Sequence, residues 1–292
     1  MILKDSFKLY ACPHCLKKHF KKKGYYYRRV SKTYIPRYFC FCCKKHFSTR
    51  TLSKTYKQKR PDLNQKVFDY LTSGVSLRRT AQKLHCNYHT VYRKFLWLSD
   101  RAKSCHSKAE FYIQELQFDE MESIEHTKLK PLTIAVATNE KYKILGVQIG
   151  TIPAKGYLSE LSKKKYGARE NQSEAVVREL LENVKASIKN KSFIIKSDAK
   201  PSYKQIVHNV YPDNLHRVHI ARENKEKKRD LKYTNLEKRV FDPIFSVNQR
   251  MAKFRDHIKR LARRSWCTTK IKENLENHVY LYIADNNNYQ LV

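Results

Sequence analysis

Cysteines are concentrated near the N-terminus, where their spacing matches that of a metal site. Five of the eight fall between Cys12 and Cys43, including two close pairs, Cys12 with Cys15 and Cys40 with Cys43, which 24 residues separate. Two such pairs can place four thiolates at the corners of a tetrahedron, the geometry that a structural Zn²⁺ prefers. A segment of this size buries little core, so a bound metal would supply much of its stability. We therefore expect residues 1–55 to form a zinc ribbon.

Other ligands and another use of the thiols are weaker alternatives. Cys42 is expected to be an extra thiol beside Cys43. Three histidines could each replace a cysteine as a ligand: His14, His19 and His46. Disulfides would need an oxidising compartment, and the N-terminal residues show no apolar segment typical of a secretory signal.

Two aspartates are candidates for phosphoryl-transfer chemistry. Asp119 follows the strand-like segment Phe111–Phe118, and Asp198 follows the apolar segment that starts at Ser192. Carboxylates at the ends of neighbouring strands can share divalent cations and support in-line displacement at a phosphodiester. A single aspartate at such a position often only caps a turn or a helix. Two of them, each predicted to close an apolar strand, favour the metal-binding interpretation.

The segments around these aspartates predict a mixed sheet with helices. Residues 111–118, 132–138 and 143–149 alternate like the strands of an antiparallel meander. An amphipathic helix over 173–188, a strand over 192–198, a helix over 203–210 and a strand over 215–220 follow. This order is that of an α/β (α+β), RNase H-like domain over residues 110–292, in which the two aspartates would sit on neighbouring central strands.

Residues 60–105 have the outline of a helix-turn-helix. Pro61 starts a helix that Gly74 ends, Ser76 is the predicted N-cap of a helix over 77–84, and a short turn leads into another helix from Tyr88. The side chains expected to face the DNA major groove are Tyr88, His89, Tyr92, Arg93 and Lys94. The alternative is an ordinary helical hairpin.

The charge of the chain predicts a polyanionic partner. It carries 61 basic and 27 acidic residues, a net charge of +34, and the first 60 residues alone hold 18 basic residues and one acidic residue. Basic residues flank three consecutive tyrosines in Lys21–Arg29, a composition suited to phosphate contact and base stacking. A content of 41% hydrophobic residues excludes a disordered basic tail. With six glycines there is no dinucleotide or P-loop motif, and no apolar run is long enough for a membrane span.

The order and spacing of four motifs resemble those of the DDE-type transposases of bacterial insertion sequences. The motifs are the four cysteines, Phe118–Met121, Ile195–Tyr203 and Asn248–Lys270. The similarity is greatest to the branch with an N-terminal zinc ribbon, a helix-turn-helix and an RNase H-like domain, and it covers nearly the whole chain.

The resemblance implies specific roles. Asp119 and Asp198 correspond to the first two acids that bind catalytic Mg²⁺ or Mn²⁺. Asn248 aligns with the third position, which is usually Glu; one branch has Asn there and a Lys about three helical turns later, for which Lys259 is the nearest match. Asp242 and Asp256 are fallback acids, although Asp242 also suits a cap before a proline and Asp256 an exposed helix face. Apart from the resemblance, basic residues recur at near-helical spacing in the same segment, Arg250 and Arg255 among them, and are expected to follow the DNA backbone.

Two functions from different classes follow. The first is a transposase that cleaves DNA at the terminal inverted repeats of its element and joins the freed 3′-hydroxyl to target DNA, as a homo-oligomer in the bacterial cytoplasm, associated with the nucleoid. The second is a catalytically decayed relative, a sequence-specific DNA-binding protein or repressor, because the third carboxylate is missing. A zinc-ribbon RNA-binding factor is a weaker third reading, since it leaves both aspartates unexplained.

Overall fold

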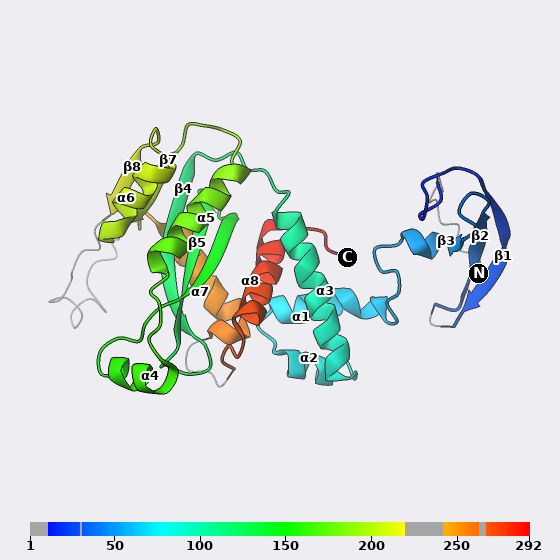
Figure 1. The fold of residues 1–292 in the computed structure, drawn as a ribbon, viewed down its shortest axis with the longest axis horizontal. Coiled ribbons are helices and arrows are strands. Elements are labelled where there is room, and N and C mark those ends of the chain that lie inside the picture. Colours follow the sequence, from blue (N-terminus) through cyan, green and yellow to red (C-terminus); the bar gives the residue numbers. More distant parts are fainter. Residues whose placement is uncertain (1–10, 30, 220–241, 263–266) are drawn as a thin grey trace, which may run out of the picture. The chain divides into compact units, whose positions relative to one another are not determined.

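The computed structural model describes residues 11–29, 31–219, 242–262 and 267–292 (Figure 1). The chain divides into two compact units, one ending at Lys66 and one spanning Val67–Leu291. Together they form a mixed α and β architecture, as the sequence predicts. Within the described residues no helix is both long and apolar enough to cross a membrane.

The first unit is built on a small antiparallel sheet. Its strands are β1 (Phe20–Arg28), β2 (Thr33–Cys40) and β3 (His46–Ser48), in the order β1-β2-β3, and two short 3₁₀ helices follow, η1 (Thr49–Leu52) and η2 (Pro61–Leu63). Its main buried cluster consists of Cys12, Cys40 and Phe47, with a few partly buried aromatic and cysteine side chains around them. A core of this size contributes little hydrophobic free energy, so the unit depends on the cysteines.

Three helices lie at the start of the second unit, and the first of them begins three residues before it, at Asn64. They are α1 (Asn64–Thr72), α2 (Leu77–Lys83) and α3 (Tyr88–His106). The side chain of Ser76 accepts a hydrogen bond from the backbone of Arg79 at 3.3 Å, so it is the N-cap that the sequence predicts. Gly74 has a φ of +74°, and a Cβ there would lie 2.9 Å from the backbone oxygen of Asp256. The helix pattern matches the expectation, although α3 runs eight residues beyond Leu98, where its predicted apolar pattern ended.

The second unit contains a five-stranded mixed sheet. The strands are β4 (Glu115–Ile124), β5 (Pro131–Asn139), β6 (Ile144–Thr151), β7 (Ile194–Asp198) and β8 (His216–His219), in the order β6-β5-β4-β7-β8. The first three are antiparallel, and β7 and β8 run parallel to β4. One expectation is corrected: Asp119 does not close its strand, because β4 starts at Glu115 and stays paired with β5 as far as Ile124.

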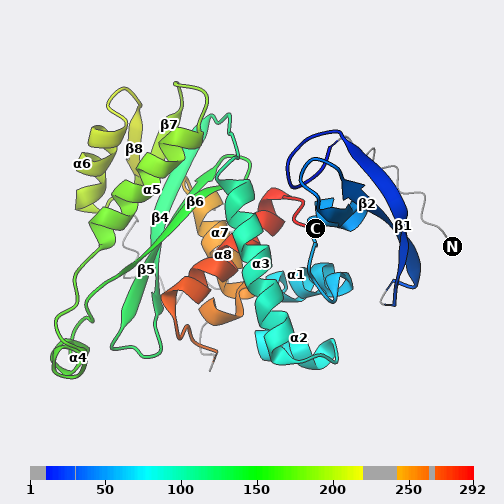
Figure 2. The same ribbon diagram turned by 45° about the vertical axis from the view of Figure 1, so that its right-hand side comes forward.

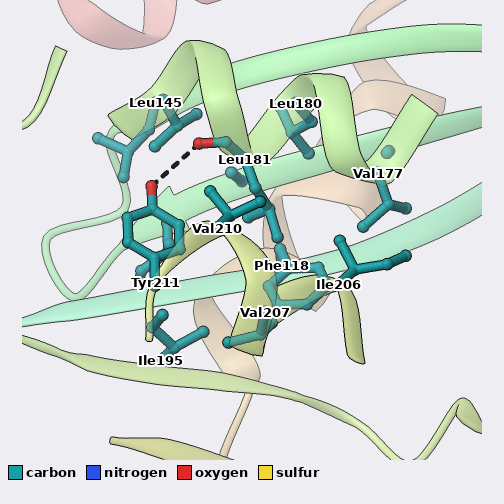
Figure 3. Close-up of a cluster of buried hydrophobic side chains, with 14 of the residues drawn as sticks. Phe118, Leu145, Val177, Leu180, Leu181, Ile195, Ile206, Val207, Val210 and Tyr211 are labelled. Atoms are coloured by element: carbon teal, nitrogen blue, oxygen red, sulfur yellow. Dashed lines mark hydrogen bonds between the residues drawn. The ribbon is translucent and has the colours of Figure 1, made fainter. Parts of the chain in front are cut away.

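Helices cover both faces of this sheet, as Figures 1 and 2 show. One face packs against α5 (Ser173–Ser187) and α6 (Pro201–Val210), and the other against α7 (Phe245–His257) and α8 (Lys272–Asn287). In the first core, Phe118 lies among leucine, isoleucine and valine side chains, and the Tyr211 hydroxyl donates to the backbone oxygen of Leu181 at 3.0 Å (Figure 3). Two short helices, α4 (Leu158–Tyr166) and η4 (Lys259–Leu261), were not anticipated.

Candidate functional site

The four paired cysteines form one cluster. The sulfur atoms of Cys12, Cys15, Cys40 and Cys43 all lie within 4.8 Å of one another. The Cys12–Cys43 and Cys15–Cys40 Sγ–Sγ distances are 3.7 and 3.6 Å. A tetrahedral ion with Zn–S bonds of about 2.3 Å requires sulfurs about 3.8 Å apart, so the cluster is compatible with zinc.

Two tight turns and one hairpin bring these thiols together. The Cys12 backbone N–H donates to Lys17 and that of Cys40 donates to Lys45, which closes each turn, and β1 pairs with β2 so that Phe20 faces Cys40. The backbone N–H of Cys43, together with that of Cys42, lowers the pKa of the Cys40 thiol to about 6 and favours its thiolate. Cys42 itself is exposed and stands outside the cluster, as do the three alternative histidines.

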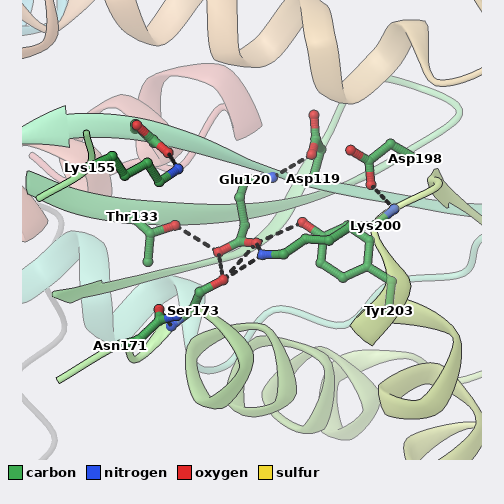
Figure 4. Close-up of polar contacts among 10 residues, drawn as sticks. Asp119, Glu120, Thr133, Lys155, Asn171, Ser173, Asp198, Lys200 and Tyr203 are labelled. Carbon is green, nitrogen blue, oxygen red and sulfur yellow. Dashed lines mark hydrogen bonds and ion pairs between the residues drawn. The ribbon is translucent and has the colours of Figure 1, made fainter. Parts of the chain in front are cut away.

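The two aspartates lie on one face of neighbouring strands. Gln117 on β4 is paired with Lys196 on β7, and Asp119 and Asp198 come two residues later on each strand. Because side chains alternate along a strand, both carboxylates share the face of Gln117, whose side chain accepts the Ser246 N–H of α7 at 3.0 Å. Both line a pocket of about 360 Å³, and Figure 4 shows the two side chains with the polar residues around them. We refer to it as the acidic pocket.

Asp119 ionises less readily than an ordinary aspartate. Its burial, above all, raises its pKa to about 6, and the nearby charges of Asp198 and Glu120 act in the same direction. The Glu120 N–H, 2.7 Å from Asp119 Oδ1, partly offsets this. Asp198 Oδ1 accepts the backbone N–H of Lys200 at 3.2 Å. A divalent cation or another positive group beside Asp119 would therefore be stabilised by the carboxylate, and it would lower the pKa of Asp119.

Glu120, whose side chain alternates with that of Asp119 along β4, forms a polar network that lines the same acidic pocket and that sequence reasoning missed. Its carboxylate pairs with the Lys200 ammonium and accepts the hydroxyls of Thr133 at 2.7 Å, Ser173 at 2.8 Å and Tyr203 at 2.9 Å (Figure 4). Burial would raise the pKa of Glu120, but these donors, Lys200 first among them, outweigh it and lower that pKa. The network ties β4 and β5 to the first residues of α5 and α6 beside the aspartates.

Asn248 and Lys259 occupy other surroundings. Asn248, in the first turn of α7, donates from Nδ2 to Asp242 Oδ2 at 2.8 Å, and Asp242 Oδ1 accepts the Ile244 N–H at 3.0 Å in the manner of a cap. Among the described residues that line the acidic pocket, neither Asn248 nor Asp242 is included. Lys259 follows the end of α7, because Ile258 is extended, and it lines a different pocket. Asp256 is largely exposed, as expected.

The predicted DNA-contacting residues differ in accessibility. Tyr88, His89 and Arg93 are exposed on α3. Tyr92 is half-buried, with its hydroxyl 3.5 Å from Asn274, and Lys94 is 6% exposed, contrary to the expectation that it faces solvent. Lys94 is directed inward because it falls on the side of α3 that also buries Val91, Phe95 and Leu98. Arg250 and Arg255 are half-buried on α7, and the Arg250 guanidinium lies 5.4 Å from the centre of the Tyr142 ring.

Comparison with known proteins adds no relative. No family model matches the chain, and no curated protein matches it. Functional inference therefore depends on the geometry of the cysteine cluster and the acidic pocket.

Proposed function

We propose that the protein is a DDE-type transposase that cleaves and joins DNA at the ends of an insertion sequence. The observation that carries the proposal is the pair Asp119 and Asp198, which lie on the same face of two adjacent parallel strands and line one pocket. Two partly buried carboxylates beside each other are costly for a fold unless a cation or a proton compensates them. Such a pair is the arrangement that metal-dependent phosphoryl transfer requires.

The architecture supports this assignment. An antiparallel β4-β5-β6 meander, continued by parallel β7 and β8 with helices on both faces, agrees with an RNase H-like domain over residues 110–292. Helices α1 to α3 agree with a helix-turn-helix over 60–105, and the four-cysteine cluster agrees with a zinc ribbon over 1–55. A DNA partner is supported by exposed tyrosines on the basic β1–β2 hairpin, namely Tyr25, Tyr26, Tyr27 and Tyr34.

The residues present suit Mg²⁺ or Mn²⁺. Mg²⁺ is commonly bound through one or two carboxylates, with waters and substrate phosphates completing its shell, and Asp119 and Asp198 offer these. When bound, the ion would activate water and stabilise charge on the phosphate oxygens. Asn248 is proposed as the third polar group of the site, with its amide orientation set by Asp242. A homo-oligomer is expected, because two DNA ends must be brought together.

The test is cleavage and strand transfer by the full-length, zinc-loaded protein with Mn²⁺ or Mg²⁺. The substrates are duplexes taken from the DNA that flanks the coding sequence. Asp119→Asn and Asp198→Asn should each lower the cleavage rate about a thousandfold, equivalent to about 4 kcal/mol. Asp256→Asn, which removes an exposed acid from α7, is the control and should retain the rate. Unchanged cleavage in either pocket variant would contradict the proposal.

A second candidate is a sequence-specific DNA-binding protein without catalysis. It is favoured by Asn248 in place of a third carboxylate. Among the described residues, the four cysteines are also the one group of three or more potential metal-ligating residues that lie close enough together. This candidate predicts tight binding to flanking DNA, no metal-dependent cleavage, and no recovery of cleavage in Asn248→Glu.

A further inference from the structure

A second pocket in the unit of Val67–Leu291 has the opposite charge to the acidic pocket. It measures about 480 Å³, and we refer to it as the basic pocket. Four cationic side chains line it, together with one tyrosine and one histidine: Arg78, Lys259, Arg260, Lys270, Tyr88 and His278. Among the described lining residues there is no Asp or Glu. Its composition therefore favours an anion.

The four cations come from separate parts of the chain. Arg78 is exposed on α2, while Lys259 and Arg260 lie on η4. Lys270 follows Thr269, which forms a parallel bridge with Glu125 at the end of β4. The Arg260 guanidinium donates to the Thr268 backbone oxygen at 3.3 Å, and this hydrogen bond holds η4 beside the stretch that contains Lys270. The fold thus brings like charges together instead of separating them.

Carboxylates do not compensate these charges in the described part of the chain. The ion pairs found there involve other lysines and arginines. The Lys270 ammonium instead lies 3.1 Å from His126 Nδ1. Four cations around one cavity repel one another, and a bound anion would remove that repulsion.

The floor of the pocket is buried and uncharged. His278 is 6% exposed and packs against Phe95 with ring centroids 4.5 Å apart. Burial, with a smaller contribution from Arg260, lowers the pKa of His278 to about 3, so the ring carries no charge at neutral pH. An apolar floor under a ring of cations concentrates their field on whatever occupies the cavity.

We propose that the basic pocket binds a phosphate group of the DNA backbone, held jointly by α2, the start of α3, η4 and Lys270. The inference rests on the proposed function in that it takes DNA as the ligand. In this proposal Lys259 binds phosphate in the basic pocket, which is a different pocket from the one that Asp119 and Asp198 line. One phosphate held there would contact both the proposed recognition helices and the segment after α7, and would fix DNA in one register relative to the sheet.

The experiment measures DNA affinity against salt. A fluorescein-labelled duplex of arbitrary sequence is titrated with full-length, zinc-loaded protein by anisotropy between about 0.05 and 0.2 M salt. The double variant Lys259→Gln/Lys270→Gln replaces two exposed side chains, and Lys163→Gln/Lys164→Gln removes the same charge from exposed positions on α4. The pocket variant should lose about tenfold in affinity, and its slope of log K against log salt should fall by about 0.9, the change expected when one phosphate is no longer neutralised.

Equal slopes and affinities for the two double variants would overturn the proposal, because net charge alone would then explain binding. Inorganic phosphate, titrated by calorimetry, distinguishes the source of the anion. Phosphate binding that the pocket variant loses, with its DNA slope unchanged, would assign the pocket to a free anion and reject the DNA assignment.

The outcome is separable from that of the proposed function. A wild-type protein without metal-dependent cleavage but with the expected slope change would reject the transposase and retain the basic pocket as a phosphate site. A protein that cleaves DNA while the two double variants bind it alike would retain the transposase and reject the basic pocket as a phosphate site.

Discussion

The cysteine cluster and the acidic pocket are both candidate metal sites, yet they relate to the fold in opposite ways. The cysteine cluster joins the turn before β1 to the turn after β2, and it lies in a unit whose main buried cluster contains three residues. The acidic pocket is assembled from β4, β5, β7, α5 and α6, and it borders a large apolar core. In the first site a metal would hold the structure together. In the second the structure holds charges that would destabilise it without a metal or a proton.

The largest expected effect is the loss of the first unit when its metal is removed. Cys40→Ser should abolish binding of one equivalent of zinc and unfold residues 11–53, because structural zinc contributes on the order of 10 kcal/mol to such domains. Limited proteolysis and zinc titration with a chromophoric chelator would measure this, and fragments within residues 67–291 should stay protected.

Cys42→Ser is the matched control, because Cys42 is exposed and outside the cluster. Zinc retained at one equivalent in Cys40→Ser, or lost equally in Cys42→Ser, would contradict the ligand assignment. Unfolding of the second unit along with the first would remove the contrast between the two sites.

The next effect has the opposite sign: Asp119→Asn should stabilise the protein. The folded-state pKa of about 6 exceeds the ordinary value of 3.8, so the fold disfavours the ionised carboxylate. This penalty is absent below about pH 4 and fully developed above about pH 7, where the variant should gain up to about 3 kcal/mol. Thermal melts across this range, without chelator or added Mg²⁺, would show the gain appearing as pH rises.

Two additions make this test sharper. Asp256→Asn should show no such gain, because that side chain is 83% exposed. Added Mg²⁺ or Mn²⁺ should narrow the difference between Asp119→Asn and wild type, since a cation beside the ionised Asp119 would compensate it. A gain that persists at pH 4 would mean that the charge of Asp119 is not its cause.

What the sequence could predict follows the same division. The cluster of four cysteines was predictable because their spacing in the sequence is local, and most helices were predictable because their apolar periodicity is strong. The order of strands and helices along the chain predicted that the strand of Asp119 and the strand of Asp198 are neighbours, as β4 and β7 are. The extent of β4 was not predictable from the sequence. Its polar residues Glu122 and Ser123 continue to pair with β5, because the antiparallel register set further along the two strands carries on through them.

Long-range side-chain contacts were also beyond prediction. Lys200 is 80 residues from Glu120 in sequence, and no local pattern indicates their pairing. The helix expected to carry Lys259 ends two residues earlier, at His257. Lys94 reads as a surface lysine, and its burial follows from the packing of α3. These residues depend on tertiary structure, which overrides the local pattern.

An intermediate effect should come from Glu120→Gln, which leaves the Lys200 ammonium without its carboxylate. Glu120 is 10% exposed and Lys200 36% exposed, so we expect a destabilisation of about 2 kcal/mol at pH 7 in denaturant unfolding. Glu122→Gln is the control two residues along the same strand. Its pair with Lys155 is exposed on both sides and should contribute less than about 0.5 kcal/mol. Equal effects would mean that the Glu120 network is not a structural support of the pocket.

The smallest effect, about 1 kcal/mol, is expected for Tyr203→Phe, which removes one of the four donors to Glu120. Those donors lower the pKa of Glu120, so the loss should be present above pH 4.5 and fade as pH falls through the folded-state pKa. Tyr211→Phe removes a hydroxyl that donates to the neutral Leu181 carbonyl, also from the α6 region. Its cost should be similar in size but constant over the same pH range in urea unfolding. Parallel pH profiles for the two variants would show that Tyr203 does not act through the Glu120 charge, and the acidic pocket would then lose its proposed electrostatic support.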